Sequence, residues 1–191
     1  MFSFQNIAQK LKTYTPKKLS LKGLQEGAVL VPIFKKEHYY YVLFTKRTEE
    51  LSTHKGQISF PGGKLDEHDS SLEECALRET WEEIGVPKTK IRIIGELDQI
   101  KTNGSNILLS SFVGQLMYPF ELKVNRKEVQ EIIKVPLIKL LEENRWRKET
   151  VDLNDDNILS WYFNYKKWTI WGATAKIIRQ FLSFIEDDFE Y

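Results

Sequence analysis

One arginine and three glutamates fall within residues 78–83, as Arg78, Glu79, Glu82 and Glu83. At about 100° per residue, a helix places Glu79 and Glu83 in line with Ala76, and Glu82 lies one ridge away. Carboxylates beside apolar residues are costly unless a positive charge meets them, and like charges at this spacing repel. A hard divalent cation, Mg²⁺ or Mn²⁺, would relieve both costs. The pattern therefore favours a metal site, and its alternative is a solvated helix face.

A glycine loop and helix-end signals position this cluster. Gly62 and Gly63 let the backbone bend tightly ahead of the helix. Ser70 or Ser71 can cap the helix start, with glutamates three residues on as capping-box partners, and Gly85 can adopt the left-handed terminating conformation. The sequence therefore predicts a tight loop followed by a helix of roughly four turns.

A second stripe on the same helix consists of Leu77, Trp81 and Ile84. Its spacing predicts packing against a hydrophobic core. Cys75 is the only cysteine of the chain, which excludes an internal disulfide. We expect it to be a small buried apolar residue and not a nucleophile.

The rest of the chain alternates strand and helix patterns, which is typical of the α/β class. Residues 3–12 predict a short amphipathic helix, followed by a connector to residue 27. Strands are predicted at 28–34, 39–46, 91–99, 106–116, 128–135, 146–152 and 158–165, and further helices at 136–141 and 171–185. We expect one domain over residues 1–191, with its core at 28–185.

Charge and hydropathy exclude several classes of partner. The 28 basic and 27 acidic side chains among 191 residues give a net charge of +1, which argues against nucleic-acid binding. No apolar run approaches the length of a membrane span, so we expect no membrane partner. The N-terminus lacks the apolar region of a signal peptide, which favours the cytoplasm. Composition leaves both a monomer and a homodimer open.

Residues 63–86 resemble the Nudix box of the Nudix hydrolases. The matching positions are Gly63, Arg78, Glu79, Glu82, Glu83, Gly85 and Val86. Asp69 stands where the box has its first glutamate, eight residues separate it from Arg78, and Thr80 replaces an aliphatic residue. The coenzyme A pyrophosphatase branch of the family shares the aspartate and the extra residue.

An upstream motif also resembles that branch, whose pattern reads LLTxRSxxLxxHxGQ(I/V)xFPGG. The corresponding residues here are Leu43–Thr48, Leu51, His54 and Gly56–Gly63. The resemblance implies a mixed-sheet α/β/α sandwich and a small-molecule nucleotide substrate. It further implies hydrolysis of coenzyme A to 3′,5′-ADP and 4′-phosphopantetheine. Another diphosphate such as ADP-ribose, a dinucleotide or a nucleoside triphosphate is the alternative substrate, and a non-catalytic binding module is the alternative function.

The resemblance also suggests roles for individual residues. Glu79 and Glu83 are expected as first metal ligands, and Glu82 as third ligand or general base. Arg78 is expected to hold Glu82 through a charge-assisted hydrogen bond. Helical spacing alone predicts that Arg78 points away from the Glu79–Glu83 line. Candidates for substrate contact are Arg47, His54, Lys55, Gly62 and Gly63.

Two glutamates outside the box, Glu128 and Glu131, follow a pattern that also resembles the branch. Either could supply a further carboxylate to the metal. The alternative is that both are surface residues of a strand.

Overall fold

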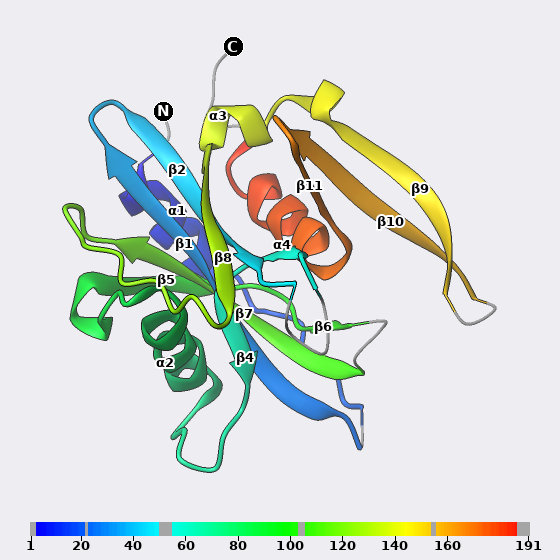
Figure 1. The fold of residues 1–191 in the computed structure, drawn as a ribbon, viewed down its shortest axis with the longest axis horizontal. Coiled ribbons are helices and arrows are strands. Elements are labelled where there is room, and N and C mark those ends of the chain that lie inside the picture. The colour runs from blue at the N-terminus through cyan, green and yellow to red at the C-terminus, as the bar shows by residue number, and fades with distance from the viewer. Residues whose placement is uncertain (1–2, 22, 50–54, 103–105, 154–155, 187–191) are drawn as a thin grey trace.

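The computed structural model describes residues 3–21, 23–49, 55–102, 106–153 and 156–186 (Figure 1). An eight-stranded mixed sheet is built around β1 (Gln25–Lys36). β1 pairs antiparallel with β2 (Tyr39–Arg47) and parallel with β7 (Ile107–Leu116). β5 (Ile91–Glu96) lies antiparallel to β7, and β8 (Val129–Pro136) lies antiparallel to β2.

Short strands complete this sheet where β1 and β2 separate. Near their shared turn, residues 33–36 of β1 pair with residues 39–42 of β2. Farther from the turn, β3 (Ile58–Ser59) pairs with β2, and β4 (Gly62–Lys64) pairs with β1. β6 (Ile100–Lys101) pairs with β7. The backbone pairing of residues 58–64 with two diverging strands therefore fixes the glycine loop in place.

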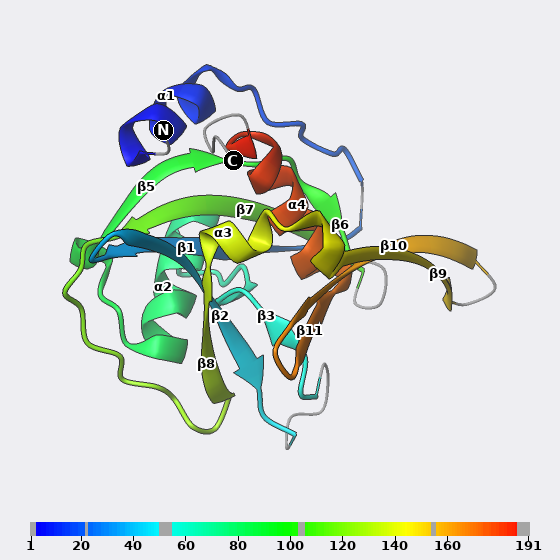
Figure 2. The same cartoon turned by 90° about the horizontal axis from the view of Figure 1, so that it is seen from above.

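Helices cover both faces of this sheet, as Figure 2 shows. α2 (Leu72–Ile84) lies on one face, and α1 (Phe4–Thr13) and α4 (Gly172–Ser183) lie on the other. Successive side chains of a strand point to opposite faces, so Leu30 of β1 joins the core under α2 while Val31 joins the core under α1 and α4. The predicted α/β/α sandwich with a mixed sheet is confirmed.

A smaller antiparallel sheet extends from the body of the molecule (Figure 1). It consists of β9 (Trp146–Leu153), β10 (Asp156–Tyr165) and β11 (Trp168–Trp171). Phe163 of β10 is buried in the core that contains α4. The sequence predicts β9 and β10 but misses β11, because four residues give too little alternation to identify a strand. The remaining elements are α3 (Leu137–Leu140), η1 (Lys88–Lys90) and η2 (Glu143–Arg145).

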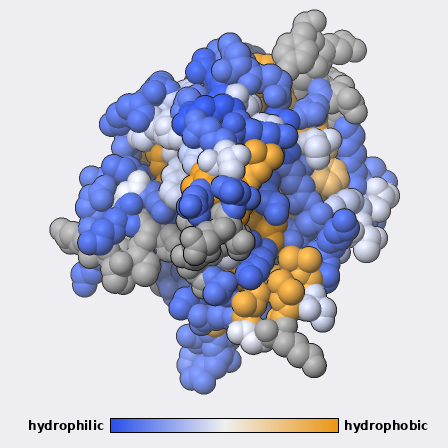
Figure 3. Space-filling view, turned by 90° about the vertical axis from the view of Figure 1, so that its right-hand side faces the viewer, coloured by the Kyte–Doolittle hydropathy of each residue, from blue (hydrophilic) through white to orange (hydrophobic). Residues whose placement is uncertain are grey.

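The molecular face that carries the β9–β10 hairpin is mainly hydrophilic (Figure 3). Smaller hydrophobic areas lie between its charged and polar residues. Leu159 of β10 is one of the exposed large apolar residues, and such single exposures are normal for a folded protein. Among the described residues, no helix is both long and apolar enough to span a bilayer.

The ends of α2 have the predicted capping residues. The Ser71 hydroxyl accepts a hydrogen bond from the Glu74 N–H at 3.1 Å. Gly85 ends the helix in the left-handed region with φ of 73°. The predicted packing of Trp81 against the core is wrong, because this side chain is 58% exposed. The buried residues of α2 are Cys75, Ala76, Thr80, Glu83 and Ile84.

Candidate active site

The two glycines of β4 lie where no larger residue fits. A Cβ on Gly62 would approach the Ala28 carbonyl oxygen to 2.4 Å. A Cβ on Gly63 would lie 2.3 Å from Oε1 of Glu79. Real Cβ contacts are not this short, so a side chain at Gly63 would displace the Glu79 carboxylate. The glycine loop therefore allows the backbone to pass directly beside α2.

Arg78 donates hydrogen bonds to three acidic side chains of the site. Its Nε and Nη2 donate to the two carboxylate oxygens of Asp69 at 2.8 and 2.9 Å. Its Nη1 donates to Glu79 at 2.9 Å and to Glu82 at 3.0 Å. The expected hydrogen bond to Glu82 is present. The expectation that Arg78 points away from Glu79 is wrong, because the long guanidinium group bends back across its neighbour.

Asp69 holds Arg78 in the site, and the sequence prediction gave it no role. Its side chain is only 2% exposed, and the Arg78 hydrogen bond lowers its pKa to about 2. The bidentate pair fixes the guanidinium plane, which in turn orients the two glutamates that Arg78 contacts. The available signal was its position in the box, where the family pattern has a carboxylate.

Glu83 is the most buried of the three site glutamates on α2, with a side chain 2% exposed. Arg47 of β2 approaches it, with 3.9 Å between Arg47 Nη1 and Glu83 Oε1. Glu83 Oε2 and Arg47 Nε are buried without a hydrogen-bond partner among the described residues. Burial raises the pKa of Glu83 to about 8, and the nearby charges of Glu79 and Glu128 add to this effect while Arg47 opposes it.

The pKa of Glu79 is also raised, chiefly by burial. Arg78 lowers it, whereas the charges of Glu82 and Glu128 raise it further. The carboxylates of α2 and Glu128 are therefore close enough to repel one another through a poorly hydrated region.

The two candidate glutamates outside the box lie in different surroundings. Glu128, directly before β8, accepts a hydrogen bond from Asn125 Nδ2 at 2.9 Å and acts electrostatically on both Glu79 and Glu83. Glu131 instead accepts from the Trp168 indole at 3.4 Å. Of the two, Glu128 borders the carboxylates of α2.

The predicted substrate-contact residues are only partly within the described structure. Lys55 is exposed at the start of the segment that leads to β3. His54 lies outside the described residues. Arg47 contacts Glu83, and Gly62 and Gly63 form β4. Their contact with substrate stays a prediction.

The oxygen ligands needed for a hard cation are present, but arginines hold them. Within the described ranges, no three acidic, histidine or cysteine side chains are gathered closely enough to hold one ion. Glu79 and Glu82 are bound to Arg78, and Glu83 faces Arg47. The buried Glu83 oxygen that has no hydrogen-bond partner in the described ranges is nevertheless the kind of atom that a hard divalent cation would satisfy.

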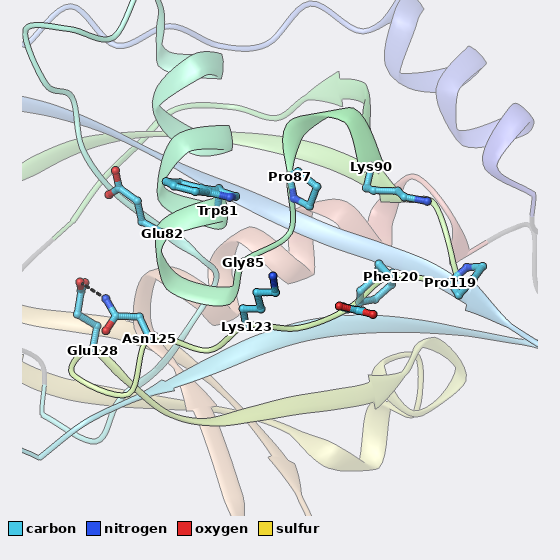
Figure 4. Close-up of a pocket in the computed structure, with 11 residues that line it drawn as sticks. Trp81, Glu82, Gly85, Pro87, Lys90, Pro119, Phe120, Lys123, Asn125 and Glu128 are labelled. Atoms are coloured by element: carbon cyan, nitrogen blue, oxygen red, sulfur yellow. Dashed lines mark hydrogen bonds between the residues drawn. The ribbon is translucent and has the colours of Figure 1, made fainter.

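A cavity of about 970 Å³ lies beside these carboxylates (Figure 4). The C-terminal half of α2 and the connection between β7 and β8 form its walls. Side chains that line it include Trp81, Glu82, Lys90, Phe120, Lys123 and Glu128. Its size suits an organic ligand larger than a single phosphate.

Comparison with known sequences identifies the family. Residues 24–163 match the family model described as the NUDIX domain. The chain is 35% identical over 165 residues to the Nudix hydrolase NudL of Photorhabdus laumondii subsp. laumondii, covering 86% of this chain and 87% of that protein. It is 30% identical over 156 residues to NudL of Escherichia coli O1:K1, covering 82% and 80%.

Solved structures share the fold. A MutT/nudix family protein of Enterococcus faecalis aligns with a TM-score of 0.62 and 15% identity, over 98% of this chain and 70% of that chain. The Nudix domain of Shewanella oneidensis NrtR, solved with ADP ribose, aligns with a TM-score of 0.51 and 23% identity, over 71% and 86%. Together with the family model, which covers most of the sequence, these results show that the chain belongs to the Nudix hydrolase family.

Proposed function

We propose that this hydrolase cleaves a nucleoside diphosphate linked to a second group, and that coenzyme A or a derivative is its substrate. One observation carries the proposal: a buried carboxylate, Glu83, has an oxygen with no hydrogen-bond partner among the described residues, and Glu79 and Glu128 act on it as further acidic groups. Burying negative charge in this way is unfavourable for folding. A divalent cation bound to these carboxylates would remove that cost and would also attract an anionic substrate.

Glu79 and Glu83 would hold the metal, with Glu82 and Glu128 as candidates for further oxygen ligands. A bound Mg²⁺ or Mn²⁺ would offset the charge of the diphosphate and lower the pKa of a water molecule. Instead of binding the metal, Glu82 could act as the general base that takes a proton from this water. The reaction adds water to one phosphorus and breaks the bridging P–O bond, so that two phosphate monoesters are released.

The arginines would orient these groups. Arg78 holds Glu79 and Glu82 at about one hydrogen-bond length each, at 2.9 and 3.0 Å. Arg47 lies 3.9 Å from Glu83 and has an Nε group without a hydrogen-bond partner among the described residues. When a cation binds Glu83, Arg47 would be free to contact a substrate phosphate. Lys55 and His54 belong to the same upstream motif and are proposed as further contacts.

The choice of coenzyme A rests on the resemblance of residues 43–63 to the branch motif. ADP-ribose is the second candidate substrate, since the related NrtR Nudix domain was solved with it. A dinucleotide or a nucleoside triphosphate would use the same carboxylates. The lone, buried Cys75 agrees with our proposal that the reaction takes place in the cytoplasm.

Product analysis tests this proposal. The purified chain is incubated with coenzyme A, an acyl-coenzyme A, ADP-ribose, a dinucleotide or a nucleoside triphosphate, each with Mg²⁺, with Mn²⁺ or with a chelator. Chromatography should show 3′,5′-ADP and 4′-phosphopantetheine from coenzyme A only when metal is present. Faster cleavage of ADP-ribose would replace the substrate assignment. No hydrolysis of any compound would favour a non-catalytic binding module.

A further inference from the structure

Two of the proposed site carboxylates, Glu82 and Glu128, line the cavity beside α2, and the other end of this cavity is chemically different. Figure 4 shows Glu82, Asn125 and Glu128 at one end and Lys90 and Phe120 at the other, with Lys123 between them. A ligand whose diphosphate lies at the acidic end would therefore extend along α2 toward aromatic and basic groups.

Trp81 is an exposed aromatic wall of this cavity. The indole is 58% exposed although it lies on a helix that packs against the core. Within the described part of the chain, its N–H group donates no hydrogen bond and its ring contacts no other aromatic ring. Large apolar groups lining a polar cavity are typical of ligand sites, since ligand binding removes them from water. Trp81 belongs to neither of the two hydrophobic clusters formed by the described residues.

Phe120 is a second aromatic wall, and it is fixed in place. Its ring packs edge-on against Phe34 with 5.2 Å between centroids, and edge-on against Tyr118 at 5.9 Å. The connection that carries it is anchored to the end of α2, because the N–H groups of Lys123 and Asn125 donate to the carbonyls of Ile84 and Glu83, both at 2.9 Å. The cavity wall is therefore held in position before any ligand binds.

Lys90 and Lys123 supply positive charge to the cavity. Across the described ranges, neither ammonium group forms an ion pair or side-chain hydrogen bond with the protein. Three carboxylates, Glu82, Glu121 and Glu128, line the whole cavity, but of these only Glu121 lies outside the acidic end. A neutral arm, such as the amide chain of pantetheine, would leave both ammonium groups without a partner, whereas a phosphate group would pair with them.

We propose that this cavity binds the nucleoside half of the substrate, with the base against Trp81 and Phe120 and a further phosphate near Lys90 and Lys123. The inference rests on the proposed function, because it assumes a diphosphate at the carboxylate end. It adds a specificity rule. The enzyme would select nucleotides that carry a phosphate on the ribose, remote from the bond that is cleaved.

Direct binding of products tests the rule without catalysis. Adenosine 3′,5′-bisphosphate and adenosine 5′-monophosphate are titrated into the wild-type chain with Mg²⁺ present, using calorimetry and tryptophan fluorescence. The bisphosphate should bind about tenfold more tightly, equivalent to one or two charge-assisted hydrogen bonds. This preference should shrink as salt is raised, because the lysines are accessible to water.

Two pairs of variants identify the residues responsible. K90Q/K123Q should bind the two nucleotides equally, whereas K101Q/K176Q, which removes the same charge from exposed positions outside the cavity, should keep the preference. Trp81→Phe should remove most of the ligand-induced change in fluorescence. Trp171→Phe, which changes an exposed tryptophan on the other side of the sheet, should retain it.

The inference is overturned if the wild type binds both nucleotides equally or binds neither. It is also overturned if K90Q/K123Q keeps the preference, or if Trp81→Phe responds like the wild type. Hydrolysis of coenzyme A by the wild type is read separately. If the wild type hydrolyses coenzyme A but K90Q/K123Q still prefers the bisphosphate, the cavity assignment alone is rejected. If K90Q/K123Q loses this preference but the wild type hydrolyses no diphosphate, the proposed function alone is rejected.

Discussion

α2 and α4 pack against opposite faces of the same sheet, yet they bury different kinds of side chain. The inner face of α4 is almost entirely apolar, with Ile177, Ile178, Phe181 and Leu182 buried. The inner face of α2 includes Thr80 and Glu83 beside smaller apolar residues. Burying a large apolar side chain stabilises a fold by about 1.5–3 kcal/mol, whereas burying a carboxylate is unfavourable. Side-chain burial on α4 therefore stabilises the fold more than side-chain burial on α2 does.

Polar contacts hold α2 where packing is weaker. Ser71 caps its start, the connection between β7 and β8 bonds to its last carbonyls, and Asp69 fixes Arg78. The Thr80 hydroxyl donates a hydrogen bond to the Ala76 carbonyl at 2.7 Å, so this buried polar group has its partner within the helix. Apolar packing therefore holds α4 on the sheet, whereas α2, which carries the proposed metal ligands, depends more on hydrogen bonds and ion pairs.

The largest effect should follow from removing a charge on α2. Glu83→Gln or Glu79→Gln should lower turnover on the order of a thousandfold, about 4 kcal/mol of transition-state stabilisation, because a ligand of the proposed metal is lost. Folding should be kept or improved, since a costly buried charge disappears. Steady-state kinetics and urea unfolding measure both quantities.

Glu73→Gln is the matched control, since Glu73 is exposed in the first turn of the same helix. Its turnover should stay near the wild-type value. Full activity of Glu83→Gln at saturating Mg²⁺ would refute the assignment of Glu83 as a ligand.

The converse change on α4 should alter stability and leave chemistry intact. Phe181→Ala removes a fully buried ring and should cost about 3–5 kcal/mol of unfolding free energy, because a cavity remains. Activity per folded molecule should be unchanged. Lys176→Ala, at an exposed position of the same helix, should cost little. A stability loss below about 1 kcal/mol for Phe181→Ala would break the contrast between the two helices.

Asp69→Asn tests whether electrostatic contacts stabilise α2. The pKa of Asp69 is about 2 in the folded chain against an ordinary 3.8. Its ionised form is therefore favoured by folding, so its contribution is present above about pH 4 and is lost as the pH falls from 3.8 toward 2. At neutral pH the variant should lose on the order of 2 kcal/mol, and this difference from wild type should vanish near the lower pKa.

Glu67→Gln provides the comparison for this variant, since Glu67 lies in the same loop with its side chain 87% exposed. Urea unfolding of the three proteins across pH gives the result. An equal loss of stability at all pH values would show that Asp69 acts through packing and not through its charge.

Local patterns were sufficient to predict most of the fold and part of the site. The capping residues and the glycine at its end define α2, and the spacing of Arg78 and Glu82 predicts their hydrogen bond because both lie on one helix. The exposure of Trp81 could not be predicted, since Ile84 of the same apolar stripe is buried together with Glu83 while Trp81 stays 58% exposed.

The parts of the site that could not be predicted from the sequence depend on contacts between segments that are far apart in the chain. Arg47 meets Glu83 only because the last residue of β2 comes close to the C-terminal half of α2, and Glu128 reaches the site through a turn held by Asn125. The Trp81 cavity requires the connection after β7 to cross the end of the helix. None of these pairings has a fixed spacing along the chain, so a motif alone does not contain them.

The smallest expected effect is on the reactivity of Cys75, which reports how tightly α2 is packed against the sheet. Cys75 is fully buried, and its Sγ lies 3.3 Å from the Lys64 carbonyl oxygen. Burial, aided by the charge of Asp69, raises its pKa to about 12, so almost no thiolate exists at pH 8. A chromogenic disulfide reagent should therefore label the native chain slowly and the urea-unfolded chain at once. The signal is unambiguous because the chain has a single cysteine, and Cys75→Ala should give none. Rapid labelling of the native chain would mean that α2 opens locally, and its polar contacts would then be weaker than the apolar packing of α4.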